Sequence, residues 1–142
     1  MKFWNTKTPK IIICNDFPEI AIPNDPIVLF NGNKVLLCYE TIPHNENYAI
    51  IEYSNIIEFK VTPINDEGLG KHPYAKYGLK FYSIHIIENT LETKRWSILG
   101  AKYWVYCFKD RTFEVIGCNY KIIELKCDRE RLNDILSQYS RM

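Results

Sequence analysis

Side chains able to transfer protons or to bind a metal are concentrated in one long segment, residues 63–78. This segment holds Asn65, Asp66, Glu67 and His72 between glycines and prolines. Carboxylates and an imidazole can act as general acids and bases, and they are suitable ligands for Mn, Fe or Zn. Asn and Asp can equally hydrogen-bond their own backbone and hold a turn. Three interpretations are therefore open: a loop that stabilises itself, a surface that recognises a partner, and a catalytic or metal-binding cluster.

A second group of chemically capable residues lies in residues 108–114, Phe-Lys-Asp-Arg-Thr-Phe-Glu, where a charged turn separates two aromatic positions. If Asp110 and Glu114 came close to Asp66, the carboxylates would form an acidic pocket with shifted pKa values. The alternative is a solvated hairpin turn in which Asp110 accepts backbone hydrogen bonds. The two interpretations differ in whether residues 63–78 and 108–114 meet in the folded chain.

Basic residues close to aromatic ones raise a third possibility, nucleic-acid binding. They are Lys94, Arg95, Lys102 and Arg111, interleaved with Trp96, Tyr103 and Trp104. Aromatic rings beside cations suit single-stranded nucleic acid. The chain as a whole carries a net charge of only +1, so no field of the whole molecule attracts nucleic acid or an anionic membrane. We therefore expect neither of them as a partner.

The two polar segments resemble those of a family of small bacterial proteins of undetermined activity. The shared pattern is Asn-Asp-Glu, His-Pro and Gly-Leu, followed by a block of the type Phe-x-Asp-x-Thr-Phe-Glu. In this chain it comprises Asn65-Asp66-Glu67, His72-Pro73, Gly78-Leu79 and, in the later block, Phe108, Asp110, Thr112, Phe113 and Glu114. The chain departs from the commoner form at Lys109 and Arg111, where a His and a small residue would stand.

This family is similar to the immunity proteins encoded beside polymorphic toxins, which implies that the chain binds and neutralises a cognate bacterial toxin. The residues implied in binding are Asn65, Asp66, Glu67, His72, Tyr74, Tyr77, Asp110 and Glu114. Tyrosines often anchor interfaces, and acidic side chains can occupy the basic cleft of a nuclease. The alternative is a small metal-dependent or acid/base hydrolase that uses His72, Asp66, Glu67 and Glu114. No motif specifies a cofactor or a metal site, and binding is favoured over enzymatic activity.

The first elements expected from the sequence are β-strands. Residues 10–14 form a short apolar run, and we expect regular pairing to begin only after Pro26, because prolines interrupt the intervening segment. Residues 27–30 and 34–39 flank Asn31-Gly32, a pair typical of a type I′ turn, so this region is predicted to be a hairpin.

Further strands are predicted at residues 48–53, 56–62 and 79–88, with His85 hydrogen-bonded within the last one. Residues 89–100 look irregular. Residues 102–109 and 112–118 form a second hairpin around Asp110-Arg111, in which Phe113 and Val115 alternate with exposed Thr112 and Glu114. Residues 120–126 add one more strand.

The C-terminal segment has the pattern of an amphipathic helix from Arg129 to about Ser140. Asp128 is a suitable N-cap, and an apolar stripe of Leu132, Ile135, Leu136 and Tyr139 follows it at helical spacing. This stripe must be buried against a sheet. We therefore predict an α+β fold, a mainly antiparallel β-sheet in the form of a roll or open barrel with one C-terminal amphipathic helix.

Length and composition indicate a single domain spanning residues 1–142. The chain is 46% hydrophobic and 25% charged, as in globular proteins rather than disordered ones. Its five cysteines are odd in number and form no Cys-x-x-Cys pair, so neither a disulfide framework nor a zinc site is indicated, and Cys38 and Cys107 are expected to be buried. Without a signal peptide or an apolar run long enough to span a bilayer, the expected location is the cytoplasm.

Overall fold

A computed structural model describes residues 8–21, 25–43 and 46–139, so the last residue of the predicted helix, Ser140, lies outside the described residues. The strands are β1 (Lys10–Ile13), β2 (Ile27–Phe30), β3 (Lys34–Glu40), β4 (Asn47–Thr62), β5 (Ile84–Glu88), β6 (Lys102–Cys107) and β7 (Thr112–Lys126). Two α-helices, α1 (Leu91–Trp96) and α2 (Arg129–Tyr139), and three short 3-10 helices complete the described elements.

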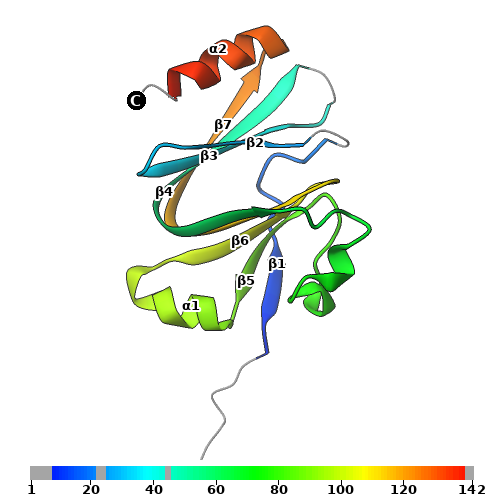
Figure 1. Ribbon diagram of the computed structural model, residues 1–142, viewed down its shortest axis with the longest axis vertical. Coiled ribbons are helices and arrows are strands. Elements are labelled where there is room, and N and C mark those ends of the chain that lie inside the picture. Colours follow the sequence, from blue (N-terminus) through cyan, green and yellow to red (C-terminus); the bar gives the residue numbers. More distant parts are fainter. Residues whose placement is uncertain (1–7, 22–24, 44–45, 140–142) are drawn as a thin grey trace, which may run out of the picture.

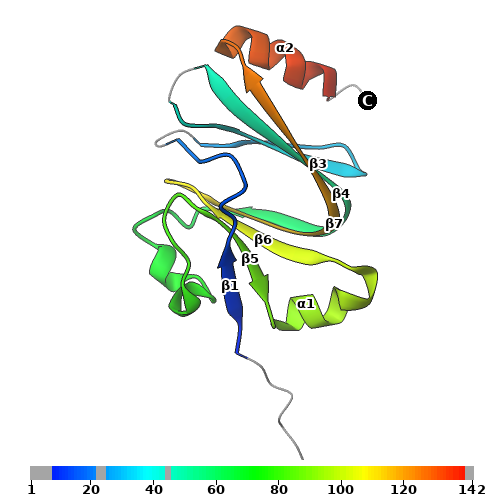
Figure 2. The ribbon, with the colours of Figure 1, turned by 180° about the vertical axis from the view of Figure 1, so that it is seen from behind.

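All seven strands form one antiparallel sheet in the order β1-β5-β6-β7-β4-β3-β2. The sheet is not closed, because β1 and β2 are its two ends and do not pair with each other. Figures 1 and 2 show that it bends strongly, so that β2 and β3 lie opposite β5 and β6. The predicted α+β class with a mainly antiparallel sheet is therefore confirmed, but the chain has a second α-helix that the sequence did not predict.

The bend is carried by β4 and β7, the two longest strands. Both run without interruption through positions where the sequence predicted separate strands, at residues 48–53 and 56–62 and at residues 112–118 and 120–126. Their pairing shifts register between Ile56 and Glu58, and Asn55 takes a positive φ of 52°. A bulge of this kind increases local bending. Gly117 lies opposite, close to Ile56, so the backbones of the two strands approach each other where the register shifts.

The predicted hairpin is present as β2 and β3, but its turn is not of type I′. That turn requires positive φ at two successive residues, whereas only Gly32 has one here. The side-chain oxygen of Asn31 accepts hydrogen bonds from the backbone N–H groups of Asn33 and Lys34, and this cap replaces the second left-handed residue.

Helix α2 covers one outer face of the sheet, as predicted. The Asp128 carboxylate accepts a hydrogen bond of 2.8 Å from the backbone N–H of Arg131, which confirms it as the N-cap. The apolar stripe of α2 packs on the α2-side cluster, which comprises Leu36, Cys38, Tyr48, Ile50, Leu132 and Leu136. Figure 1 shows α2 at one end of the molecule, beside the end of β7 and the start of β4.

At the other end of the bent sheet, the outer face is covered by residues 63–83 and by α1. A loop-side cluster lies beneath them and comprises Leu69, Ile87, Tyr103, Val105, Cys107 and Ile116. Because of this cover, Thr112 and Glu114 are buried at 1% and 4% exposure, so the prediction that they face solvent is wrong. The interior of the bend holds the central cluster, whose aromatic members include Tyr39, Tyr53, Trp104, Tyr106, Phe108 and Phe113.

Two other strand predictions need correction. Regular pairing begins before Pro26, because β1 pairs with β5 over four residues. The strand predicted at residues 79–88 begins only at Ile84, because residues 81–82 form a turn in which Tyr82 takes a positive φ of 55°. No described helix is long and apolar enough to cross a membrane.

Candidate functional site

The two polar segments singled out in the sequence lie side by side in the fold. The backbone N–H of Asp66 donates a 2.8 Å hydrogen bond to the carbonyl oxygen of Lys109. The hydroxyl of Thr112, at the start of β7, donates to the carbonyl oxygen of Ile64, also at 2.8 Å. Residues 63–83 are therefore anchored to the β6–β7 turn, and the candidate residues of both segments belong to one region.

Asn65 and Asp66 stabilise the turn in which they lie. The Asn65 side chain accepts from the backbone N–H of Gly68. One Asp66 carboxylate oxygen accepts from the N–H of Glu67 and the other accepts a 2.7 Å hydrogen bond from the Tyr82 hydroxyl. Asp66 is only half-buried, but both of its oxygens are used within the chain. The Glu67 side chain, in contrast, is exposed.

His72 and Glu114 form a buried contact beneath this turn. Both residues are 4% exposed, and Nε2 of His72 lies 3.2 Å from Oε2 of Glu114. Nδ1 of His72 accepts a hydrogen bond from the backbone N–H of Tyr74, which places the proton of a neutral ring on Nε2. That N–H is not aligned for a hydrogen bond with the carboxylate, so the contact is mainly electrostatic.

Glu114 remains ionised despite its burial. Burial alone would raise its pKa, but the contact with His72 and the hydrogen bond from the Tyr103 hydroxyl outweigh burial, and Lys60 adds to their effect. The pKa of Glu114 therefore lies below its ordinary value. Lys60 Nζ lies 4.0 Å from Oε2 of Glu114, on the neighbouring strand β4.

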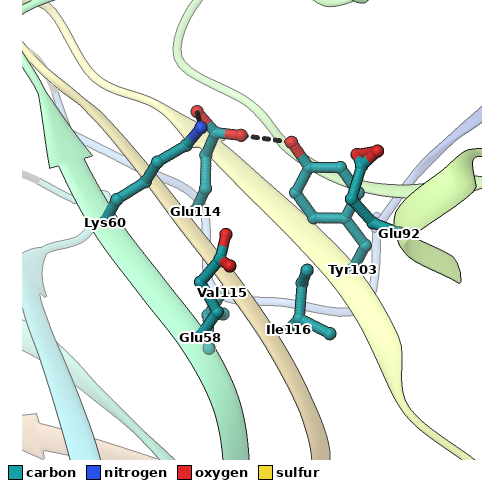
Figure 3. A pocket seen from close by; sticks show the side chains of 7 residues that line it. All are labelled: Glu58, Lys60, Glu92, Tyr103, Glu114, Val115 and Ile116. Atoms are coloured by element: carbon teal, nitrogen blue, oxygen red, sulfur yellow. Dashed lines mark hydrogen bonds and ion pairs between the residues drawn. The ribbon is translucent and has the colours of Figure 1, made fainter. Parts of the chain in front are cut away.

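A pocket of about 270 Å³ opens above this carboxylate. Figure 3 shows Glu114 and Tyr103 joined by their hydrogen bond, with Lys60 over the carboxylate and Glu92 beside the Tyr103 ring. The other lining residues are Glu58, Val115 and Ile116. The pocket thus brings three carboxylates, one ammonium and one phenol together on the outer face of the sheet.

The two tyrosines predicted to bind a partner also make contacts within the chain. The Tyr74 hydroxyl donates to both carboxylate oxygens of Glu92, at 3.0 and 2.9 Å, and its ring meets that of Tyr103 edge to face. Burial and the Glu92 hydrogen bond raise the pKa of Tyr74 to about 12. Tyr77 is half-buried, with Lys76 Nζ 5.2 Å from its ring centroid. Tyr74 therefore holds α1 against the loop.

Aromatic and acidic side chains meet at the exposed end of the region, and we name them the acidic–aromatic patch: Asp66, Glu67, Phe81, Tyr82 and Asp110. Phe81 is 56% exposed, and its ring centroid lies 6.0 Å from that of Tyr82. The pKa of Tyr82 is raised, first by its hydrogen bond to Asp66, with a smaller contribution from the charge of Asp110. Asp110 is exposed at the tip of the β6–β7 turn.

Sequence reasoning missed Glu92 and Phe81, and it named Tyr103 only as an aromatic neighbour of basic residues and not as the partner of Glu114. Glu92 lies on α1, whose start is a capping box in which Thr90 and Thr93 bond each other's backbone. The Thr-x-x-Thr spacing was a signal for this helix, although the usual residue at the third helical position of a capping box is Glu or Gln. Tyr103 reaches Glu114 only through the pairing of β6 with β7, and no local pattern indicated that contact.

The remaining candidates have structural roles. His85 is buried, accepts from the backbone N–H of Lys80 and contacts the carbonyl oxygen of Val105, which confirms the expected sheet histidine. Burial raises the pKa of the Cys38 and Cys107 thiols to about 12, and both residues are buried as predicted. Tyr103 and Trp104 are buried, so they cannot stack on nucleic-acid bases.

Among the described residues, no group of three or more His, Cys, Asp or Glu side chains is placed to hold a metal ion. His72 meets Glu114, whereas Asp66 is bonded to Tyr82, so the four residues of the hydrolase hypothesis do not converge on one point. Comparisons with protein-family models, with curated proteins and with solved structures found no match for this chain.

Proposed function

We propose that this protein binds and neutralises a bacterial protein toxin in the cytoplasm, and that the acidic–aromatic patch is the contact surface. The observation that supports the proposal is the exposed Phe81 ring, which lies beside the ring of Tyr82, and Tyr82 in turn bonds Asp66 and lies in the field of Asp110. An exposed aromatic side chain with a charged rim is the usual composition of an interface anchor.

The patch is also preorganised, which favours binding. Asp66 is fixed by the Tyr82 hydroxyl and by the backbone of Lys109, so the turn that carries Glu67 is held against the turn that carries Asp110. A surface that is already ordered loses little conformational entropy on association. Its negative charge would attract the basic cleft of a nuclease and give fast, salt-sensitive association.

The experiment is a binding measurement with the toxin encoded beside the gene, together with growth rescue on co-expression. Phe81→Ala should weaken binding about 30-fold, the loss typical of an interface anchor. Glu67→Lys and Asp110→Lys should mainly slow association and reduce its salt dependence. Asp134→Lys makes the same charge change on an exposed residue of α2, far from the patch, and should bind like the original protein.

Two outcomes would contradict the proposal. If the adjacent toxin forms no complex and growth is not rescued, the function is wrong. If a complex forms but Phe81→Ala, Glu67→Lys and Asp110→Lys bind as tightly as Asp134→Lys, the function stands and the acidic–aromatic patch is the wrong surface.

A second candidate, an acid/base hydrolase, is favoured by one observation, the buried His72–Glu114 contact beneath a pocket of about 270 Å³. A histidine oriented by a backbone N–H and placed against a carboxylate resembles a catalytic base with its orienting group. Hydrolysis of ester, phosphodiester or glycoside test substrates that is abolished in His72→Gln, with the fold intact, would support it. Equal hydrolysis rates in the original protein and in His72→Gln would contradict the hydrolase function.

A further inference from the structure

Strand β2 is an edge strand without the usual protection against pairing. Its sequence is Ile-Val-Leu-Phe, and it lies at one end of the sheet with β3 as its only described strand neighbour. Edge strands in natural proteins normally carry charged side chains, a proline or a bulge that prevents pairing with another chain. The four residues of β2 provide none of these, and Phe30 is 53% exposed.

The backbone groups that point away from β3 can be identified from the hairpin register. Asn31 donates its N–H to the carbonyl oxygen of Lys34, and the pairs above it are Phe30 with Val35, Leu29 with Leu36 and Val28 with Leu37. Hydrogen-bonded pairs alternate in an antiparallel ladder. Leu29 therefore bonds to β3, whereas the N–H and C=O groups of Val28 and Phe30 point outward. No backbone hydrogen bond joins these two residues to another described segment.

We propose that β2 pairs antiparallel with β2 of a second copy of this chain, across a two-fold axis at Leu29. In this register Val28 lies opposite Phe30 of the other copy, so every outward N–H and C=O of the two strands finds a partner within the other strand. The two sheets then continue as one. The exposed Phe30 ring is covered by Val28 of the second copy on the same face.

The arrangement of β2 favours a second copy over a different protein strand. The outward groups are symmetric about Leu29, so the edge is complementary to itself without any further component. No charge on the strand opposes like-with-like pairing. Pro26 has no N–H, so the series of outward backbone donors ends just before β2. The pairing is therefore limited to the residues of β2.

The first test is the mass in solution as a function of concentration. The original protein should shift from 16.8 kDa toward twice that mass as concentration rises. Val28→Pro removes one outward donor from each copy without removing a bond to β3, and should weaken the dimer about tenfold. Phe30→Lys should weaken it similarly by placing charges on the edge. Ile11→Pro is the matched control. The backbone N–H of Ile11 also points outward, but on the other edge strand, β1, so this variant should dimerise like the original protein.

The second test fixes the register. With oxidised glutathione as the oxidant, Leu29→Cys should form a disulfide-linked dimer, because residue 29 would face its own copy in a non-hydrogen-bonded pair where Cα atoms lie about 4.5 Å apart. Ile27→Cys, on the same face of β2, should not. A protein that stays monomeric at all concentrations overturns the proposal, and so does a dimer unaffected by Val28→Pro and Phe30→Lys. Cross-linking at residue 27 in place of residue 29 overturns the register.

Discussion

Glu114 shows how a single residue keeps a charge inside the protein. Burial opposes ionisation, but His72, Tyr103 and Lys60 together hold the pKa of this carboxylate below its ordinary value of 4.5. A carboxyl group whose pKa is lower in the folded state than in the unfolded state stabilises the fold above the unfolded pKa. That contribution disappears as the pH falls through the lowered value.

Replacing Glu114 by Gln should therefore destabilise the protein in a pH-dependent way. At pH 7 the free energy of unfolding should fall by about 2 kcal/mol, because the amide keeps the Tyr103 hydrogen bond but loses the charge facing His72 and Lys60. Urea unfolding of both proteins between pH 7 and pH 3 measures this difference. It should stay constant above pH 4.5 and shrink below it. A difference that grows toward acid pH would mean that Glu114 is protonated in the folded protein.

The bond between Asp66 and Tyr82 gives a prediction about a pKa. Tyr82 is the donor and the Asp66 carboxylate raises the pKa of its hydroxyl. Asp66→Asn removes the negative charge, so the pKa of Tyr82 should fall toward the ordinary value of about 10. Titration of the Tyr82 ring carbon by NMR measures it directly, with Glu67→Gln as the control. An unchanged pKa in Asp66→Asn would show that the bond does not form in solution.

At this scale the sequence predicted local hydrogen bonds to the backbone better than the burial of side chains. Asn65 and Asp66 satisfy local backbone groups, as the structural interpretation of the loop anticipated. Glu114 was expected on an exposed face, because alternation along β7 gave no sign that residues 63–83 would cover it. The burial of a side chain by a distant segment depends on tertiary contacts that no local pattern contains.

Among the elements, α2 is the one whose stability depends most clearly on a local signal. Asp128 accepts from the N–H of Arg131 and satisfies one of the unpaired donors of the first turn. Asp128→Ala should lower the free energy of unfolding by about 1 kcal/mol. Thermal or urea unfolding measures the loss, and Asp134→Ala, on an exposed position of the same helix, should change it much less. Equal effects would indicate that the cap is not formed.

Elements with strong local signals were predictable, and the others were not. The Asn31-Gly32 hairpin and α2 have turn residues, a cap and an apolar stripe that agree with one another. Helix α1 has only six residues and no buried side chain in its span, so its amphipathic pattern is too short to detect. The continuity of β4 and β7 through a bulge depends on the pairing of the two strands, which residues 54–55 and 118–119 do not reveal individually.

At the scale of the whole molecule, each of the two outer apolar clusters shares strands with the central cluster. On β3, Leu36 belongs to the α2-side cluster, and its neighbour Leu37 belongs to the central cluster. On β7, Val115 contributes to the central cluster and Ile116 to the loop-side cluster. Adjacent residues of one strand cannot leave their clusters independently, so the described residues should unfold as one cooperative unit.

Leu132→Ala tests this cooperativity, and with it the prediction of a single domain. Leu132, on the buried side of α2, is fully buried, and its truncation should lower the free energy of unfolding by about 3 kcal/mol. Near-UV circular dichroism follows the aromatic side chains of the central cluster, on the far side of the sheet from α2, and far-UV circular dichroism follows the secondary structure. Because β3 and β7 link the clusters, both urea midpoints should shift equally. If the near-UV midpoint of Leu132→Ala stays at the original urea concentration while the far-UV signal changes at a lower one, the α2 layer unfolds on its own.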